Sequence, residues 1–234
     1  MLNPEFVTVE ADGVPYPGFE SVQVSASIKE AARTFKVETT ERPGQYKFPP
    51  GTHIAIRANG DLLCDGYVNR FEPSGDATSH KISISGRSKS QDAVDSSADT
   101  ETGEWDDADP EQVAKDLFKP YGVDVKAKVP LEKVPRWAIA PGERALENVI
   151  RMMRPQGITA MGNADGSVEL TNAQAATFAF GMLMEGWNIK SYKGALSDEG
   201  RFSKYSVRGQ RRLGTQDEDL QIEEEAEDSG GNRS

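Results

Sequence analysis

The chain of 234 residues is 36% hydrophobic and 28% charged, which is typical of a globular protein long enough for two modest domains or for one long all-β unit with an inserted piece. Its formal net charge of −11 argues against a nucleic-acid-binding surface, because such surfaces depend on lysine and arginine. Cys64 is the only cysteine, which excludes an intrachain disulfide and a cysteine-based zinc site.

The sequence contains no segment typical of export or membrane insertion. The first residues lack a basic flank followed by an apolar run, and no later stretch approaches the roughly 20 apolar residues that span a bilayer. We therefore expect no membrane insertion. The 22 glycines and 13 prolines are spread along the chain, a distribution that favours many short strands joined by turns.

The first 86 residues predict a curled antiparallel sheet or a small barrel. Apolar residues alternate through residues 20–40, which predicts two strands, and a helix over residues 28–35 is the competing interpretation. The pair Asn59-Gly60 favours a tight hairpin turn, and Gly66 in the returning strand predicts a bulge or a sharp bend.

The next segment, "SGRSKSQD" at residues 85–92, is basic and rich in hydroxyl groups. A phosphate-binding loop needs a longer glycine-flanked turn that ends in Gly-Lys-Ser or Gly-Lys-Thr, and this segment has one glycine and a different order. We interpret it as a strand that ends at Gly86, followed by Ser88 or Ser90 at the start of a short helix. Arg87 is expected to contact an acidic or backbone partner, and Asp92 across the turn is one candidate for that partner.

Two helices and a hairpin are predicted in the middle of the chain, where they would form a small α+β unit. Asp109 as the N-cap and Pro110 at the first helical position favour the start of one helix. The other helix is expected within residues 141–157, because its apolar residues recur at helical spacing. The hairpin strands are expected at residues 158–161 and 168–170.

The last part of the chain predicts two long strands and then an acidic tail. The strands are expected within residues 186–210, on either side of a turn at 197–200. Residues 215–234 contain a dense acidic run and a Gly-Gly pair near the end. Because like charges repel, we expect this tail to stay hydrated rather than to pack.

The motifs contain no complete catalytic or metal-binding set. His53 and His80 lack the neighbouring ligands of a metal site, and residues 163–169 lack the carboxylate series of a calcium loop. The acidic pairs at 106–107 and 198–199 could in principle be glycosidase carboxylates, but both fall in predicted exposed loops. We therefore expect no metal and no cofactor.

The three tryptophans are Trp105, Trp137 and Trp187. We interpret them as core or subunit-interface anchors rather than as sugar-binding platforms, because large aromatic side chains dominate the energetics of cores and interfaces.

Four segments together resemble the baseplate hub proteins of Mu-like contractile-tailed phages. No single segment is specific, but their order and spacing extend from residue 5 to residue 213. The segments are "PPGTHIAIRANGDLLCDGYVNRFEPSGDATSHKISISGRSKSQDAVDSS" (49–97), "PGERALENVIRMMRPQGI" (141–158), "ADGSVELT" (164–171) and "RFSKYSVRGQ" (201–210).

The resemblance implies a β-rich α+β fold with a tail-tube-like β-barrel domain, an inserted small α+β domain and part of a second barrel. We expect these three domains at residues 1–98, 99–175 and 176–213, followed by an acidic flexible tail at 214–234. Such hub proteins usually continue well beyond the strand at 201–210. We therefore expect the chain to be a fragment, or its second barrel to be completed by other segments or by another chain.

The resemblance also implies a structural protein rather than an enzyme. It would form a homotrimeric ring that adapts the sixfold tail tube to the threefold central spike in the virion tail baseplate, after assembly in the bacterial host cytoplasm. The expected partners are further copies of itself, the tail tube protein, the central spike protein and other baseplate proteins. DNA or the tape measure protein would pass through the lumen without specific binding, and an acidic lumen would weaken the adhesion of DNA.

Two other functions remain open from the residues. One is a cell-wall-degrading tail module that uses Glu104, Asp106 or Asp107 as its acids, and the other is a peptidoglycan-binding module formed by residues 141–171. The residues with expected structural or interface roles in a hub are Gly66, Tyr67, Gly86, Arg87, Asp92, Trp187, Tyr205, Gly209 and Gln210.

Overall fold

The computed structural model describes residues 6–40, 48–76, 80–172, 184–189, 191–194, 201–210 and 221–229. The chain folds as two units, Met1–Phe178 and Ala179–Ser234.

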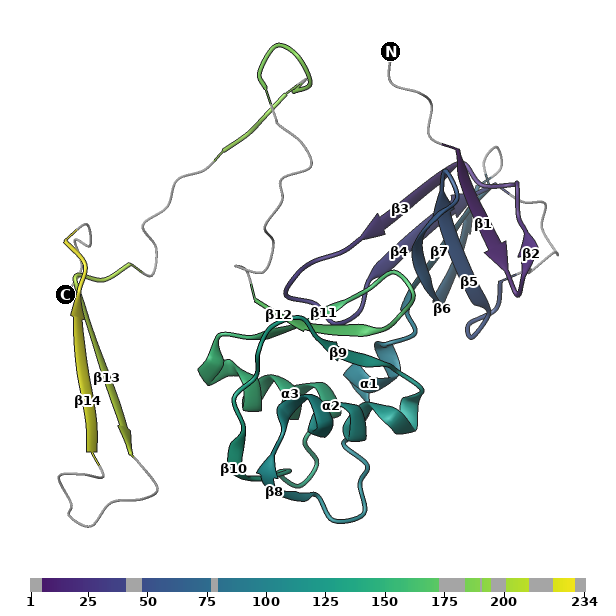
Figure 1. The fold of residues 1–234 in the computed structure, drawn as a ribbon. Coiled ribbons are helices and arrows are strands. Elements are labelled where there is room, and N and C mark those ends of the chain that lie inside the picture. Colours follow the sequence, from purple (N-terminus) through teal and green to yellow (C-terminus); the bar gives the residue numbers. More distant parts are fainter. Residues whose placement is uncertain are drawn as a thin grey trace. The chain divides into compact units, whose positions relative to one another are not determined.

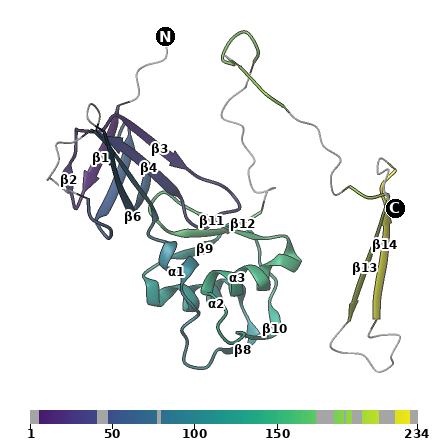
Figure 2. The same cartoon turned by 180° about the vertical axis from the view of Figure 1, so that it is seen from behind.

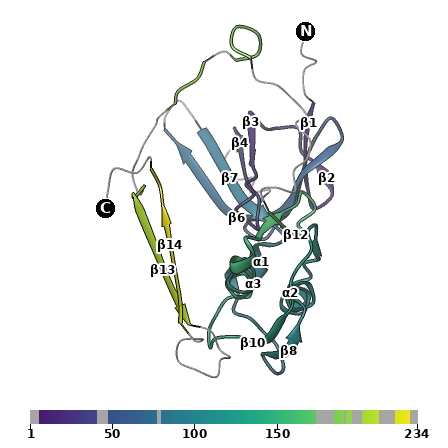
Figure 3. The ribbon, with the colours of Figure 1, turned by 60° about the vertical axis from the view of Figure 1, so that its left-hand side comes forward.

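Unit 1 begins with a seven-stranded sheet that curls into half of a barrel (Figure 1). The strand order is β2-β1-β5-β6-β7-β4-β3, and every neighbouring pair is antiparallel. The long strands β6 and β7 run side by side and extend beyond their neighbours (Figure 3). The strands are β1 (Val7–Ala11), β2 (Val14–Pro15), β3 (Ser21–Ser25), β4 (Thr34–Thr39), β5 (His53–Ala58), β6 (Asp61–Gly75) and β7 (His80–Ser88).

Alternating burial explains why residues 20–40 form two strands. Phe35 and Val37 of β4 are buried with exposed residues before and between them, a spacing of two that a sheet provides and a helix does not. The competing helix over residues 28–35 is therefore wrong. Residues 26–33 form the loop between β3 and β4.

The hairpin turn at Asn59-Gly60 is confirmed, because Asn59 has a φ of 51° and Gly60 a φ of 91°. Positive φ at both central residues is what a tight hairpin requires. The irregularities in β6 lie elsewhere than predicted. The register shifts leave Leu63 as the extra residue against β5 and Asn69 as the extra residue against β7.

Gly66 is therefore not a bulge. It pairs with Ile54 on one side and with Ser88 on the other, and a methyl group at this position would lie 2.0 Å from the carbonyl oxygen of Arg87. The close approach of two strands, rather than curvature, requires a glycine here.

Gly86 does not end its strand, in contrast to the prediction. It is buried in the middle of a β7 that continues to Ser88, and it pairs with Val68 on β6 and Phe35 on β4. A methyl group at Gly86 would lie 2.5 Å from the Phe35 ring. Gly86 thus makes room for the ring of a core phenylalanine rather than starting a turn.

The second part of unit 1 is the predicted small α+β unit. A three-stranded sheet has the order β11-β12-β9, and the helices α2 and α3 lie between it and the β8–β10 ribbon (Figures 1 and 2). The elements are α1 (Gln91–Asp95), β8 (Glu104–Ala108), α2 (Pro110–Phe118), β9 (Val125–Ala127), β10 (Val134–Ala138), α3 (Ala145–Met153), β11 (Thr159–Gly162) and β12 (Val168–Thr171), with short 3-10 turns at Lys119–Tyr121 and Arg154–Gln156.

The two longer helices, α2 and α3, begin in different ways. The carboxylate of Asp109 accepts hydrogen bonds from the backbone N–H of Glu111 and Gln112, which confirms the predicted cap of α2. Helix α3 starts at Ala145, four residues after the predicted Pro141, because residues 141–144 form a turn that is tied back by Glu143.

Unit 2 contains an antiparallel ribbon of β13 (Lys204–Gln210) and β14 (Gln221–Glu227). β14 lies within the segment predicted to be an acidic flexible tail, so that prediction is wrong for these seven residues. Two of its glutamates pair with cations across the ribbon, Glu225 with Lys204 at 2.8 Å and Glu223 with Arg208 at 2.8 Å. Cross-strand neutralisation offsets the repulsion that the acidic run suggests.

These elements confirm the predicted β-rich α+β fold class. The longest helices described have nine residues, and no helix in the described ranges could cross a membrane.

Candidate functional site

The open edges of the seven-stranded sheet are candidate contact surfaces, because an unpaired strand can pair with another chain. β2 has only two residues and includes Pro15, which lacks an N–H group. The part of β6 that extends beyond β5 contains Pro73 and an Arg70–Glu72 ion pair. Proline and charge make both edges poor partners for a further strand.

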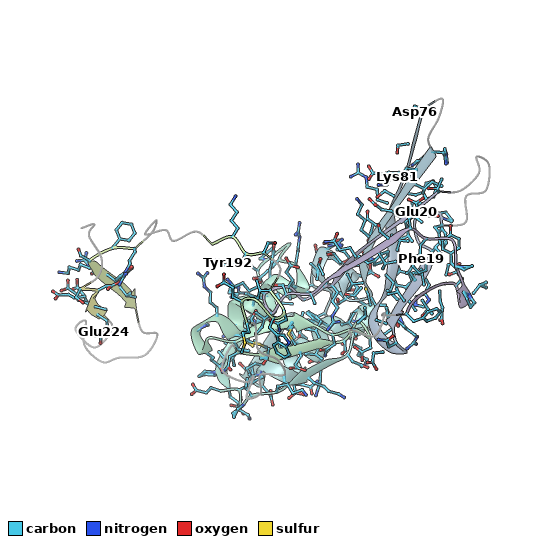
Figure 4. All side chains as sticks on the ribbon, turned by 90° about the horizontal axis from the view of Figure 1, so that it is seen from above. Phe19, Glu20, Asp76, Lys81, Tyr192 and Glu224 are labelled. Atoms are coloured by element: carbon cyan, nitrogen blue, oxygen red, sulfur yellow. The ribbon has the colours of Figure 1, made fainter. Side chains whose placement is uncertain are left out.

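β3 is the exception. It reads Ser-Val-Gln-Val-Ser, without proline or charge, and its outer side pairs with no described strand. Figure 4 labels Phe19 and Glu20, which lie directly before β3, and Asp76 and Lys81, which lie at the turn of the β6–β7 hairpin. β3 is therefore the candidate assembly edge of unit 1.

Three of the predicted site residues lie on the paired strands β6 and β7. Gly66 and Gly86 are buried and allow close strand packing. Tyr67 sits between them on the ladder, and its ring meets that of His53 edge to face, with centroids 5.6 Å apart. The two glycines therefore have a structural role within the sheet, and Tyr67 packs against a neighbouring strand.

Arg87 makes the acidic contact that the sequence predicts, but with Asp95 instead of Asp92. The Arg87 guanidinium donates to both carboxylate oxygens of Asp95, and these hydrogen bonds hold the pKa of that carboxyl below its usual range. The pair fastens the end of β7 to α1 (Gln91–Asp95). Asp92 is exposed in the first turn of α1. The pair is partly exposed, so we assign it a modest structural role.

The motif Pro141-Gly142-Glu143 has a structural explanation. The Glu143 carboxylate accepts from the backbone N–H of Ala140 at 3.1 Å and from the Asn148 amide at 2.7 Å. It also accepts two hydrogen bonds from the Arg151 guanidinium, at 2.7 and 2.8 Å. The Arg151 bonds, followed by the Ala140 and Asn148 contacts, lower the pKa of Glu143 to about 2.

A carboxyl with so low a pKa is fully ionised and engaged, which is the opposite of what a general acid requires. Wherever a carboxyl pKa shift is resolved in the described residues, at Glu38, Asp95, Glu143 and Asp165, its direction is downward. These four carboxylates therefore support ion pairs and turns rather than proton transfer.

Two of the tryptophans form a cross-strand pair on the β8–β10 ribbon. Trp105 and Trp137 are direct partners in the register. The Trp105 indole N–H donates to Asp116 on α2 at 3.2 Å, and that of Trp137 donates to Asn148 on α3 at 2.9 Å. The Arg151 guanidinium lies 4.2 Å from the Trp137 ring centroid. Both rings are held against helices, as expected for core anchors.

Two of the acidic residues proposed for a hydrolase are paired with cations on β10 or directly before it. Glu104 accepts from Arg136 at 2.8 Å, and Asp107 accepts from Lys133 at 2.6 Å. These contacts raise the pKa of Arg136 and Lys133. The other candidate acids, residues 198–199, lie outside the described residues.

The histidines do not gather metal ligands. His53 contacts the Asp65 carboxylate, which also accepts from Lys89, so this carboxylate is already held by two protein side chains. Among the residues that the structure describes, no three histidine, cysteine, aspartate or glutamate side chains come together as a metal site would need. Burial raises the pKa of the Cys64 thiol to about 11, which keeps it unreactive.

In unit 2, the predicted interface residues Trp187 and Tyr205 are more exposed than Gly66 and Gly86 of unit 1. Trp187 is 74% exposed on a turn, and Tyr205 is 41% exposed on β13. Val207, two residues further along the same face, is 63% exposed. Gly209 and Gln210 end β13, where they pair with Ile222 and Gln221.

Sequence reasoning missed one residue that connects distant parts of unit 1. Arg33 lies in the loop before β4, and its side chain reaches carbonyl groups on β6 and β11. A single charged residue after two buried alanines is a weak signal, because its partners lie 30 and 129 residues away along the chain.

Two family models match the chain in succession. Residues 6–88 match the N-terminal domain of Mu phage baseplate assembly proteins like GpP, and residues 90–172 match the second domain of baseplate hub proteins like gp44.

Relatives with known names agree with these matches. Baseplate hub protein gp44 of Escherichia phage Mu is 31% identical over 221 residues, which is 92% of this chain and 58% of the Mu protein. The 43 kDa tail protein of prophage MuSo2 from Shewanella oneidensis matches with a TM-score of 0.85 and 26% identity, over 98% of this chain and 71% of that protein. A tail protein from Neisseria meningitidis MC58 shares the fold, with a TM-score of 0.70 and 18% identity over 87% of this chain and 64% of that protein.

The matches confirm the resemblance noted in the sequence, although the chain spans only 58% of the length of the Mu protein. Both domain models match in the expected order and the Mu hub protein aligns over 92% of the residues, so the chain is similar to the baseplate hub proteins of Mu-like phages over most of its length.

Proposed function

We propose that this chain is a structural component of a phage tail baseplate hub. In this role it forms a homotrimeric ring that adapts the sixfold tail tube to the threefold central spike, and the ring is part of the conduit for DNA. The observation that carries the proposal is the alignment with the Mu baseplate hub protein over 92% of the chain. Its place would be the virion tail baseplate, after assembly in the host cytoplasm.

The domain limits belong to the same proposal. We assign residues 1–98 to the first barrel domain, 99–175 to the α+β domain and 176–213 to part of a second barrel. The half-barrel of β1–β7 supports the first assignment, because an open curled sheet needs neighbours to close a ring.

We propose β3 as the strand through which unit 1 meets a neighbouring copy. It is the edge without proline or charge, and alternating Val22 and Val24 would continue an apolar face into a paired strand. Cyclic rings need such heterologous contacts, in which one edge meets a different surface of the next copy.

The variant Gln23→Lys with Ser25→Lys tests this edge, because both side chains are exposed and lysine on an edge strand opposes pairing. Val14→Lys on the proline-containing edge β2 is the matched control. The first variant should lower the trimer fraction at a given concentration without a change in the unfolding midpoint, and the control should leave the trimer fraction unchanged. Equal effects of both would remove β3 from the interface.

A structural role agrees with the charges of the chain. The relatives are named as baseplate hub and tail proteins, and the candidate acids Glu104 and Asp107 are held in ion pairs. The formal net charge of −11 would favour an acidic lumen that weakens the adhesion of passing DNA. A ring whose lumen is lined chiefly by lysine and arginine would contradict that part of the proposal.

Light scattering and a peptidoglycan turnover assay separate the structural role from the enzymatic one. The proposal predicts a threefold mass for the assembled particle and no turnover above that of a Glu104→Gln, Asp106→Asn, Asp107→Asn variant. Turnover that disappears in this variant would establish a cell-wall hydrolase instead. Retention of the chain on purified cell walls, without turnover, would favour a peptidoglycan-binding module.

A further inference from the structure

The two family domains of unit 1 meet at a dense set of contacts, which we name the interdomain seam. On the side of the first domain it contains the β3–β4 loop (residues 26–33), residues 63–65 of β6, and Ser88 and Lys89. On the side of the second domain it contains the end of β11 and the β11–β12 turn (residues 162–167).

Backbone hydrogen bonds cross the seam at two places. The N–H of Gly162 donates to the carbonyl oxygen of Glu30 at 2.9 Å, and the N–H of Asp65 donates to that of Ala164 at 2.8 Å. The β11–β12 hairpin is thus bonded to two separate segments of the first domain.

Arg33 connects its own loop to β6, β7 and β11. Its Nε donates to the Gly162 carbonyl oxygen at 3.1 Å, and its Nη1 donates to that of Leu63 at 2.8 Å. Its backbone exchanges hydrogen bonds with Ser88, at 3.0 Å to the hydroxyl and 2.9 Å from the N–H. Leu63 is the extra residue of the β5–β6 bulge, and a bulge leaves its residue out of the ladder, which frees this carbonyl for the guanidinium.

The seam is packed so closely that two of its positions require glycine. A methyl group on Gly162 would lie 2.5 Å from the carbonyl oxygen of Ala31. Gly166, with a φ of 85°, would place one 2.7 Å from the Cβ of Lys89. No larger side chain fits without a shift of the backbone on one side.

The first domain also contributes directly to the core of the second. Ala31, in the β3–β4 loop, is buried in one cluster with side chains of α2, α3 and the three-stranded sheet β11-β12-β9. Its carbonyl oxygen accepts from the Ser90 hydroxyl at 2.6 Å, and Ser90 in turn contacts the buried Ser88 hydroxyl at 2.8 Å. Removing the first domain would therefore open the core of the second.

We infer that the two family domains form one rigid body that opens and unfolds as a single unit, with Arg33 as the positioning residue that fixes their relative orientation. No hinge is left between β7 and α1, because hydrogen bonds cross the boundary between the two domains, Ala31 belongs to the core of the second domain, and Gly162 and Gly166 allow no larger side chain. The inference does not depend on the role of the chain in a hub.

Hydrogen–deuterium exchange of the full chain against denaturant concentration tests this inference. In the wild type, the slowest amides of β7 and of α3 should open with the same free energy and the same denaturant dependence, because they share one unfolding event. Opening of the two domains with clearly different free energies in the wild type would overturn the inference, whatever any variant does.

The variant Arg33→Met keeps the length of the side chain and removes its donors. Loss of charged hydrogen bonds to two partly buried carbonyl groups should speed exchange in both domains by at least about tenfold, and by the same factor. The control Arg70→Met changes an arginine that is 71% exposed and should leave both domains unchanged. If Arg33→Met does not fold, Arg33→Lys replaces it, with the same factor expected in both domains. Faster exchange confined to one domain in either variant would contradict the inference.

Discussion

The substitution Gly86→Ala is a sharp test of how the first sheet is packed. Its added methyl group would lie 2.0 Å from the Tyr67 carbonyl oxygen and 2.5 Å from the buried ring of Phe35. Neither neighbour can yield easily, because the oxygen belongs to the β6 backbone and the ring fills the core beside Val37 and Ile84.

Insertion of a methyl group into a close-packed core costs up to about 3 kcal/mol, and displacement of a backbone carbonyl places this site at the upper end. For a unit of this size, such a loss lowers the melting temperature by roughly 6–12 °C. Calorimetry and urea denaturation measure both quantities. Gly194→Ala is the matched control, because no atom lies within 4 Å of its added methyl group. A loss below about 1 kcal/mol at Gly86, or an equal loss in the control, would refute the packing argument.

Three further outcomes follow from the site network. The pKa of Glu143 is about 2 in the folded chain against an ordinary 4.5, so the contribution of its carboxylate to the free energy of unfolding is complete above pH 4.5 and is lost as the pH falls towards 2. The difference in the free energy of unfolding between the wild type and Glu143→Gln should therefore narrow from pH 4.5 to pH 2. A difference that stays constant over that range would contradict the assignment. Trp137→Phe should lower the free energy of unfolding by about 1–2 kcal/mol, because it removes the hydrogen bond to Asn148 and weakens the contact with Arg151. An unchanged free energy of unfolding in urea denaturation would argue against Trp137 as a core anchor. Asp95→Asn should cost less than about 1 kcal/mol in the same assay, because its pair with Arg87 is partly exposed, whereas a larger loss would mean that the pair has more than a modest role.

Local rules were sufficient to predict many elements. The Asn59-Gly60 turn, the N-cap at Asp109 and the alternation in β4 each depend on neighbouring residues along the chain. In all three cases the backbone geometry or the burial pattern is determined within a few residues, so the sequence contains the whole signal.

Other features depend on contacts that the local sequence does not reveal. Gly86 carries the same local signal as a turn glycine, and only the Phe35 ring, 51 positions earlier, shows that it belongs in mid-strand. Likewise, the acidic run of β14 becomes a strand through cations on β13, and ten residues separate the two strands.

The candidate site was harder to predict than the fold. Arg87 was correctly expected to meet an acid, but its partner is Asp95, because α1 turns that carboxylate towards β7. Arg33 was missed, since a contact with Gly162 across 129 positions leaves no local pattern. The exposed positions of Trp187 and Tyr205 agree with interface roles but do not test them.

The mass and shape of the particle in solution test the central claim most directly. Light scattering across a range of concentrations, combined with electron microscopy of the same sample in the presence of the tail tube protein, would measure both. The account predicts a ring of three copies that binds the end of the tube. A chain that remains monomeric at every concentration, and that does not associate with the tube, would contradict it.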